Sequence, residues 1–352
     1  MTTPSPGRTG SRALRVGLVG YGLAGRVFHA PFLAADPDFS LVAISTGDPE
    51  RAAAASAAHP GARIVAGLDG VLAERPDLVV LATPPSVHRE QAEQVLAAGV
   101  AVVIDKPFAP STADVDAILA ASEAAAAPVF VFQNRRWDAD FLTLRRLLGE
   151  GALGEVIRFE STFERWSAPK TGRWQTAIGP EQGGGILFDL GSHLVDQALV
   201  LFGPAVVTAA ETRVVHEGGA SEDDAFVSLR HESGVRSHLT MSRVARAAAP
   251  RFRVLGTRAA FSVDGLDPQE GALRGGGASP LDEDFGVVPA GAEGVLVDEH
   301  GTAAVPSARG HYAAFLAGVA RTLLDSTPSP VDVRDARAVV ALIEQAHALA
   351  TG

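Results

Sequence analysis

The chain has 352 residues, of which 47% are hydrophobic and 20% charged, and its formal net charge is −11. This length predicts two domains, because single cores rarely grow beyond about 250 to 300 residues. The negative charge and the lack of a Lys/Arg block argue against nucleic acid or a membrane surface as a partner. No apolar run approaches the roughly 20 residues of a membrane span. The absence of cysteine excludes disulfides, thiolate metal ligands and a cysteine nucleophile.

Residues 1–11 are rich in Ser, Thr, Pro and Gly and lack the apolar core of a signal peptide. We therefore predict a disordered tail at 1–11 and a cytoplasmic location. The folded chain is expected to begin at residue 12.

A glycine-rich turn follows the first predicted strand, Leu14 to Val19, and leads into a predicted helix. A GxGxxG turn in this context places backbone N–H groups against a dinucleotide pyrophosphate. The alternative is a tight turn that only packs a helix on a strand. Pro31 lies within the helix, which we therefore expect to bend or end early. The cofactor-binding candidates of this turn are Gly20, Gly22, Leu23, Ala24 and Gly25.

Residues 12–134 alternate β-rich and helical runs, the pattern of a parallel sheet covered on both faces. A helix is predicted at Ser86 to Ala98, with Ser86 as its cap and Gly99 at its end. The pattern predicts a complete dinucleotide-binding Rossmann domain. Its later strands are expected at 41–45, 63–65, 78–81, 101–104 and 129–132.

The second strand ends in Ser45-Thr46-Gly47, at the place where a carboxylate selects NAD in Rossmann domains. Hydroxyl groups can hydrogen-bond a 2′-phosphate that an aspartate would repel. Ser45 and Thr46 therefore favour NADP, with NAD as the alternative, and Arg51 or Arg26 would supply a positive charge. In the other interpretation, Ser45 and Thr46 simply begin the next helix.

The fourth strand ends in a segment that we expect on the ligand-binding edge of the sheet. Thr83 and Pro84 are predicted to line the nicotinamide ribose. His88 is included as a cofactor contact, although a surface or capping role is favoured over catalysis.

Asp105-Lys106-Pro107 ends the fifth strand. Pro107 biases Lys106 toward an extended conformation beside the nicotinamide. A lysine there can hydrogen-bond a substrate hydroxyl and stabilise a developing alkoxide. The alternative is a solvated surface lysine. We count Asp105 and Lys106 with the cofactor-binding residues and Lys106 with the catalytic ones.

A helix at 140–148 and a strand at 156–163 precede an apolar helix that carries Asp189, His193 and Asp196. At spacings of four and three, these side chains share one helix face. The imidazole is a proton acceptor near physiological pH, and a carboxylate on its face can orient it. The alternatives are an N-cap aspartate, a surface salt bridge or a zinc pair. Zinc needs a third ligand that we cannot identify, so no metal is predicted.

The remaining elements predict an α+β domain over residues 135–352, with a continuous and mainly antiparallel sheet. The segment 265–310 is expected to be irregular, and two helices begin near 310 and 332. The long strands after 156 predict an exposed apolar sheet face, and hence a homo-oligomer, dimer or tetramer. Further strands are predicted at 225–230, 234–241, 251–255 and 260–263.

With Asp105-Lys106-Pro107 and the Asp189 and His193 pair both placed, the chain resembles the Gfo/Idh/MocA oxidoreductases from Leu14 to the C-terminus. The segments 20–32, 134–141 and 189–197 are most like the NADP-dependent scyllo-inositol dehydrogenase branch. The resemblance implies a Rossmann domain, a second domain with an open, predominantly antiparallel sheet, and tolerance of Pro31. The usual Glu-Lys-Pro is Asp-Lys-Pro here, and the branch's Ser-Arg is Ser45-Thr46. The implied catalytic set is Lys106, Asp189 and His193.

These observations predict an NADP-dependent dehydrogenase that acts reversibly on a secondary alcohol of a cyclic polyol or sugar. His193 takes the hydroxyl proton, Asp189 supports it and Lys106 stabilises the oxygen. The alternatives are a non-catalytic dinucleotide-binding regulator or sensor, and a dehydrogenase of a different sugar or small carbonyl compound. Polar and aromatic groups suit sugar hydroxyls and ring faces, so the candidate substrate contacts are Asn134, Arg136, Arg165, Trp174 and Tyr312.

Overall fold

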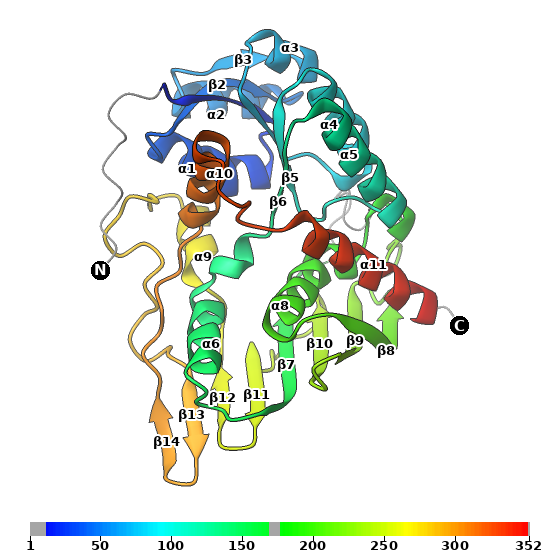
Figure 1. The fold of residues 1–352 in the computed structure, drawn as a ribbon, viewed down its shortest axis with the longest axis vertical. Coiled ribbons are helices and arrows are strands. Elements are labelled where there is room, and N and C mark those ends of the chain that lie inside the picture. Colours follow the sequence, from blue (N-terminus) through cyan, green and yellow to red (C-terminus); the bar gives the residue numbers. More distant parts are fainter. Residues whose placement is uncertain (1–11, 169–176, 351–352) are drawn as a thin grey trace.

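The first half of the chain forms a parallel sheet in the computed structural model, which describes residues 12–168 and 177–350 (Figure 1). Within the described residues, the six strands follow the order β3-β2-β1-β4-β5-β6, and every neighbouring pair is parallel. This is the Rossmann order, which reverses between β1 and β4 and opens a ligand crevice there. The strands are β1 (Leu14–Val19), β2 (Phe39–Ser45), β3 (Arg63–Val65), β4 (Leu78–Leu81), β5 (Ala101–Asp105) and β6 (Val129–Phe132).

Helices bury both faces of this sheet. In β4, Leu78 and Val80 join a core shared with α1 and α10, whereas Val79 and Leu81 join a core shared with α3, α4 and α5. Strands buried on both sides need a continuous apolar run, which explains the sequence of β4. The helices are α1 (Ala30–Ala35), α2 (Pro49–Ala58), α3 (Gly67–Ala73), α4 (His88–Ala97), α5 (Thr112–Ala125) and α10 (Ala313–Asp325).

Two proline-containing segments shape the helix starts near the crevice. A π-helical turn, η1 (Gly25–His29), follows the glycine turn, and α1 then begins with Pro31 in its first turn. The expected interruption of this helix is confirmed. The prediction that Ser86 caps the next helix is wrong, because Pro85–Val87 forms a 3-10 turn, η2, and α4 begins at His88 without a side-chain cap.

The second sheet is predominantly antiparallel, as predicted. Among the described residues, its eight strands follow the order β14-β13-β12-β11-β7-β10-β9-β8, and the β7·β10 pair is parallel. Its inner face is buried by three helices, α6 (Ala139–Gly149), α8 (Ser192–Phe202) and α11 (Val333–Ala350) (Figure 1). The strands are β7 (Val156–Glu164), β8 (Ala205–Arg213), β9 (Asp224–His231), β10 (Arg236–Ser242), β11 (Phe252–Gly256), β12 (Ala260–Val263), β13 (Val295–Asp298) and β14 (Gly301–Ala304).

Among the remaining helical elements, α11 packs against both sheets. The helix α11 contributes Ala336 and Val340 to a core of the first sheet and Val339 and Ile343 to the core of the second. The elements are η3 (Asn134–Trp137), α6 (Ala139–Gly149), η4 (Pro180–Gln182), η5 (Leu187–Gly191), α8 (Ser192–Phe202), α9 (Pro268–Arg274) and α11 (Val333–Ala350).

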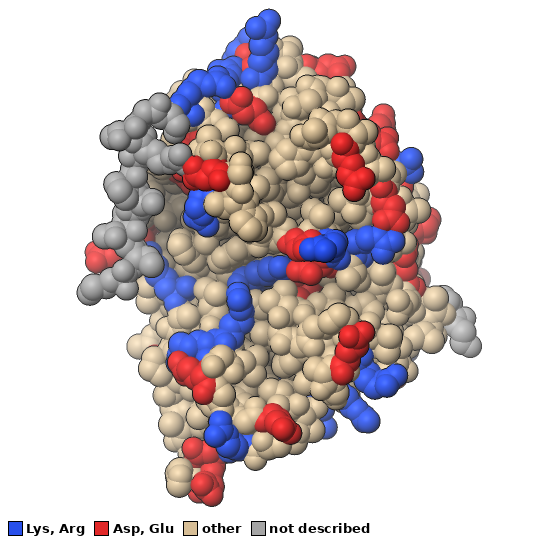
Figure 2. All heavy atoms as spheres, in the orientation of Figure 1, with Lys and Arg blue, Asp and Glu red and all other residues tan. Residues whose placement is uncertain are grey.

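The outer face of the second sheet is mixed rather than uniformly apolar, because it carries charged side chains as well as Val206 and Val297, which are 47% and 43% exposed. Alternation in β7 buries Phe159 and Phe163 and leaves Arg158 and Glu160 on the other side. Glu160 pairs with Arg158 at 2.7 Å and with Arg253 of β11 at 2.9 Å. On the face of the molecule drawn in Figure 2, basic and acidic side chains likewise lie next to one another.

The segment 265–310 is more regular than expected. It contains α9 and the β13·β14 hairpin, which extends the sheet at one edge (Figure 1). The strand β8 at the opposite edge was also missed. In the described part of the chain, no helix combines the length and the apolar character needed to cross a membrane.

Candidate active site

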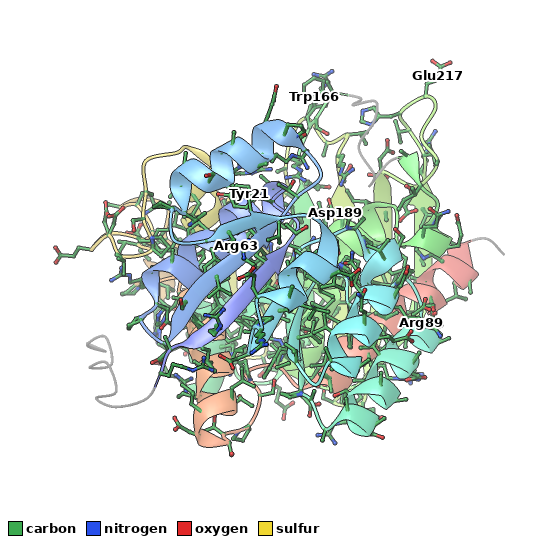
Figure 3. The ribbon with its side chains drawn as sticks, turned by 90° about the horizontal axis from the view of Figure 1, so that it is seen from above. Tyr21, Arg63, Arg89, Trp166, Asp189 and Glu217 are labelled. Atoms are coloured by element: carbon green, nitrogen blue, oxygen red, sulfur yellow. The ribbon has the colours of Figure 1, made fainter. Side chains whose placement is uncertain are left out.

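A cleft of about 560 Å³ lies at the carboxyl ends of the first sheet's strands. Its opposite wall comes from β7, η5, α8 and α9, and Figure 3 shows Asp189 between the two sheets. The cleft therefore joins the Rossmann crevice to the second half of the chain. The predicted site residues that line it are Gly20, Gly22, Leu23, Ala24, Ser45, Thr46, Thr83, Pro84, Asp105, Lys106, Asn134, Arg165, Asp189 and His193.

The glycine turn fits a dinucleotide pyrophosphate. At Gly22, which lines the cleft, an added Cβ would meet nothing nearer than the Arg51 guanidinium at 3.7 Å, so the backbone faces open space. Gly25 has another role than the predicted cofactor contact. It does not line the cleft, and an added Cβ would collide with the carbonyl of Gly20, so this glycine packs the turn together.

The adenosine end of the cleft carries hydroxyl groups and a positive charge. Ser45, Thr46 and Arg51 line it. The nearest carboxylate in sequence, Asp48, accepts a hydrogen bond from the backbone N–H of Arg51 at 3.0 Å and so caps α2. Within the described lining of this end, no carboxylate opposes a 2′-phosphate.

Lys106 lies at the other end of the cleft, where β5 stops. Its Nζ donates to the Asp189 carbonyl at 2.6 Å and to Asp189 Oδ1 at 3.2 Å. Asp105 accepts from the Lys106 backbone N–H at 2.8 Å and faces the buried His29 at 3.7 Å. Burial opposes ionisation of Asp105, but His29 and Lys106 outweigh it and lower the pKa of this carboxyl. Asp105 thus fixes the backbone from which Lys106 extends.

Asp189 is held by two cations. Lys106 takes one carboxylate oxygen, and the buried Arg243 pairs with the other. Burial pushes the pKa of Asp189 upward, but Lys106, Arg243 and Arg165 outweigh it and hold that pKa below its ordinary value. Asp189 is therefore ionised throughout the physiological range.

His193 lines the cleft but does not interact with Asp189 as predicted. Its Nδ1 is buried and has no hydrogen-bond partner among the described residues. The π-helical turn η5 contains Asp189, and its wider turn breaks the 3.6-residue periodicity on which the prediction relied. Burial, reinforced by Lys106, Arg135 and Arg251, holds the pKa of His193 well below 6.5. The ring is therefore neutral at neutral pH.

Comparisons with known proteins agree with this geometry. Residues 14–133 match the model of an oxidoreductase family with an NAD-binding Rossmann fold, and residues 141–262 match the Gfo/Idh/MocA C-terminal domain. The chain is 37% identical to the uncharacterized oxidoreductase YdgJ of Escherichia coli, over 94% of each chain. The chain belongs to the Gfo/Idh/MocA oxidoreductase family.

Two further similarities support this assignment. The scyllo-inositol 2-dehydrogenase (NADP(+)) IolW of Bacillus subtilis is 29% identical and is covered over 96% of its length by 98% of this chain. The solved structure of the oxidoreductase yvaA from Bacillus subtilis has a TM-score of 0.89 at 29% identity, with 98% of each chain covered. Both similarities extend over the whole fold of this Gfo/Idh/MocA member.

Besides Gly25, three predicted site residues of this family member lie outside the cleft lining: His88, Arg136 and Tyr312. His88 is fully buried, and its ring bonds the carbonyls of Thr83 at 2.9 Å and Pro107 at 3.1 Å. It links the two loops that carry Thr83 and Lys106, so the prediction that His88 contacts the cofactor is corrected. His88 has this structural role because it is buried between the ends of β4 and β5.

Arg136 and Tyr312 are also corrected, because other side chains of the protein bind them. Arg136 donates to both oxygens of Asp196 at 2.6 and 2.8 Å and to Asp335 at 3.2 Å. This pairing also removes Asp196 from the predicted polar face. Tyr312 is buried and donates to Asp138 at 2.7 Å. Trp174 lies outside the described residues.

Several residues at the substrate end of the cleft were not predicted from the sequence. The lining also includes Arg135, Phe163, Glu270 and Arg274, and Arg243 stands behind Asp189. Arg135 directly follows Asn134 and could have been found from that neighbour. For Arg243, its position after β10 gives no local signal.

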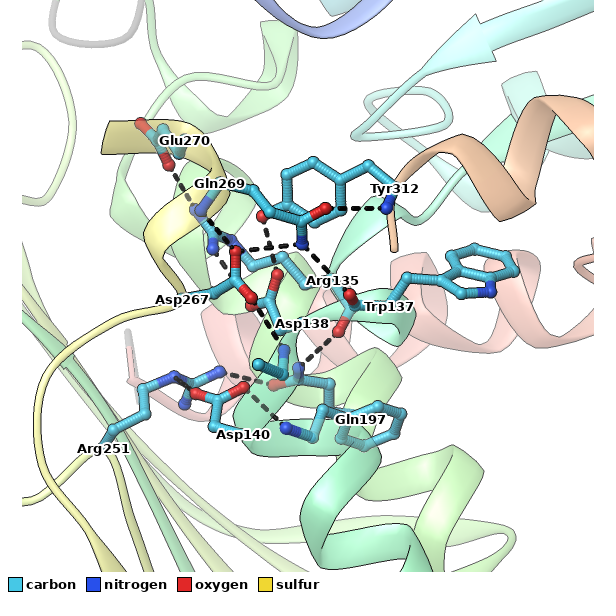
Figure 4. A network of polar contacts seen from close by, with 12 residues as sticks. Arg135, Trp137, Asp138, Asp140, Gln197, Arg251, Asp267, Gln269, Glu270 and Tyr312 are labelled. Atoms are coloured by element: carbon cyan, nitrogen blue, oxygen red, sulfur yellow. Dashed lines mark hydrogen bonds and ion pairs between the residues drawn. The ribbon is translucent and has the colours of Figure 1, made fainter. Parts of the chain in front are cut away.

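A polar network adjoins this end of the cleft, because Arg135 and Glu270 belong to both (Figure 4). Arg135 donates to Asp138 at 3.1 Å and to Glu270 at 2.6 Å. Arg251, which is 1% exposed, donates to Ser161 and Gln197, each at 2.6 Å. The network therefore connects the floor of the cleft to the second sheet.

Acidic groups in the same network are difficult to ionise. Asp267 accepts hydrogen bonds from the backbone N–H groups of Ala139 at 2.7 Å and Gln269 at 2.8 Å. Burial and the nearby charges of Asp138 and Asp140 nevertheless raise the pKa of Asp267 to about 8. In the residues that the structure describes, no group of three or more His, Asp or Glu side chains could hold a metal ion.

Proposed function

We propose that this chain is an NADP-dependent dehydrogenase that oxidises a secondary alcohol of a cyclic polyol or sugar, reversibly and with an inositol-like substrate. The observation that carries the proposal is that Lys106 and His193 line the same cleft as the glycine turn. A proton acceptor and a cation thus lie where the dinucleotide groove reaches the second sheet. The similarity to IolW supports the substrate class.

The residues of the glycine turn and of the β4 and β5 ends would hold the nicotinamide cofactor, which accepts the hydride when bound. Lys106 donates a hydrogen bond to the substrate oxygen and stabilises the negative charge that develops on it. His193, neutral because its pKa is low, accepts the hydroxyl proton. Asp189 is a positioning residue, because it fixes the ammonium group of Lys106.

NADP is the proposed cofactor rather than NAD. Ser45 and Thr46 offer hydroxyl groups, and Arg51 offers a positive charge at the same end of the cleft. A charge-assisted pair between a guanidinium and a phosphate is strong because both groups are ionised. Arg51 is the better of the two arginines considered, because the other, Arg26, does not line the cleft.

We also propose that the protein is a homo-oligomer. The outer face of the second sheet supports this, because it offers apolar side chains such as Val206 together with charged ones such as Glu160 and Arg253. Light scattering at micromolar concentration tests the proposal, and a monomer would contradict it.

A panel of inositols and aldoses, with their ketones and lactones, tests the function with each cofactor. We expect a change in nicotinamide absorbance with at least one polyol and a higher kcat/KM with NADP. Turnover confined to a different sugar or small carbonyl compound would keep the hypothesis of a dehydrogenase but change its substrate class. Cofactor binding without turnover of any compound would instead indicate a dinucleotide-binding regulator or sensor.

A further inference from the structure

Arg165 and Arg243 extend from the same edge of the second sheet. The strands β7 and β10 are parallel, and Glu164 pairs with Ser242 at their ends, so the two arginines follow at matching positions. The Arg165 backbone N–H continues the ladder by donating to the Ser242 carbonyl at 2.9 Å. Phe163 and Met241, two residues earlier, are buried on the inner face. Alternation therefore directs both arginines toward the cleft.

The cations at this edge outnumber the carboxylates. Asp189 uses one oxygen for Lys106 and the other for Arg243. Arg165 lines the cleft beside them, yet no hydrogen bond or ion pair of its guanidinium occurs among the described residues. Burial lowers the pKa of Arg165, and the charges of Arg243 and Arg274 add to this effect while Asp189 and Glu270 oppose it.

The other guanidinium groups of this end have partners. Arg135 pairs with Asp138 and Glu270, and Arg274 pairs with Glu270 at 3.4 Å. The ring of Phe163 lies 4.8 Å from Arg135 Cζ and 5.8 Å from Arg165 Cζ, so the floor beneath Arg165 is an aromatic face and a second cation. This excess of positive charge arises in a chain whose net charge is −11. Arg165 is half-buried at the cleft, and an anionic ligand would supply the partner that the described residues do not.

We propose that Arg165 binds an anionic substituent of the substrate, a carboxylate or a phosphate, so that the preferred substrate is an acidic derivative of a polyol or sugar. This inference rests on the proposed function and narrows its substrate class. Carboxylate and phosphate oxygens share the geometry that a guanidinium binds through two parallel hydrogen bonds. The position of Arg165 next to Asp189 places that substituent close to the reacting carbon.

Steady-state kinetics with matched compounds test the proposal. Glucose, glucuronate and glucose 6-phosphate would be compared with NADP as cofactor, as would myo-inositol and its monophosphate. The preference is the ratio of kcat/KM for the anionic compound to that for its neutral counterpart. We expect it to favour one anionic compound in the wild type and to fall about 10- to 100-fold in Arg165→Gln. The comparison of the carboxylate compound with the phosphate compounds shows which of the two groups Arg165 binds.

Two variants distinguish direct binding of the anionic group by Arg165 from attraction by the overall positive charge of the cleft. Arg165→Lys keeps the charge without the fork of donors, and its preference should lie between those of the wild type and Arg165→Gln. Arg274→Gln removes an equal charge whose partner is Glu270, and it should change the preference by less than about threefold. An equal preference in the wild type and Arg165→Gln, or an equal loss in Arg274→Gln, would overturn the proposal.

Calorimetric titration of the NADPH-loaded protein with the same compounds keeps this test independent of turnover. Binding of glucuronate or glucose 6-phosphate that weakens in Arg165→Gln supports the anion site, even if no compound is turned over and the dehydrogenase proposal fails. Binding that is the same in both proteins overturns the anion site, whatever the turnover. Unfolding midpoints of the variants check that each is folded.

Discussion

Two neighbouring polar regions of this protein differ in where their partners come from. In the network of Figure 4, the buried Arg135 and Arg251 each donate to at least two acceptors of the chain. In the adjoining cleft, His193 Nδ1 and the Arg165 guanidinium have no such partner among the described residues. From this contrast we infer that the network stabilises the second half of the chain, and we propose that ligands supply the partners of the cleft residues.

The same difference explains which predicted contacts were wrong. Arg136 and Tyr312 have the residue types expected of sugar-binding groups, but Asp196 and Asp138 already use them. A buried polar group with its partner present stabilises the fold, whereas one without a partner costs free energy that a ligand can recover. The partner, rather than the residue type, decides the role.

Replacing His193 should have the largest effect on the cleft side of this comparison. His193→Ala should lower turnover by about 10²- to 10⁴-fold, because general base catalysis contributes that much. Cofactor affinity should change little, since the glycine turn lies at the other end of the cleft. Steady-state kinetics and titration of NADP measure the two quantities. A matching loss of cofactor affinity would mean that His193 supports the fold of the cleft instead.

Replacing Arg136 should have the largest effect on the structural side. Arg136→Met leaves Asp196, which is 2% exposed, without its guanidinium, and should cost about 3 to 5 kcal/mol of unfolding free energy. Chemical denaturation measures this, with Arg334→Met as the control because Arg334 pairs with Asp332 on the surface. If both variants were equally stable, the buried pair would not be part of the stabilising framework.

Changing the charge at the adenosine end should alter cofactor choice and little else. Ser45→Asp should shift the preference toward NAD by about tenfold or more, because its carboxylate repels a 2′-phosphate. Arg51→Gln should shift it in the same direction by a smaller factor. The ratio of kcat/KM for NADP and NAD measures both effects. Tighter binding of NAD than of NADP by the wild type would contradict the proposed cofactor.

The sequence contains enough local information to predict the Rossmann half and the position of its ligand edge. The glycine turn, Lys106 and His193 could be predicted because each lies at a strand end or a helix start with a recognisable sequence pattern. In the structure they line one cleft. Contacts between distant residues were not predictable in this way. Arg136 and Asp335 are 199 residues apart in the sequence, and nothing near Arg243 indicates its pairing with Asp189.

Helix geometry limited the prediction at Asp189 and His193. Their spacing of four suggests one face of an α-helix, but the π-helical turn Leu187–Gly191 changes the angle between them. A π-helical turn has no simple signature in a single sequence. The two residues were therefore assigned correctly to one cleft and incorrectly to one interacting pair.

The dependence of turnover on pH in the wild type and His193→Ala tests the catalytic account most directly. His193 must be neutral to accept a proton, so oxidation should rise as the pH rises through its pKa. Burial, together with Lys106, Arg135 and Arg251, lowers that pKa, so the rise should lie below pH 6.5. The account predicts this limb in the wild type and its loss in His193→Ala. A variant that keeps both the limb and the wild-type turnover would contradict it.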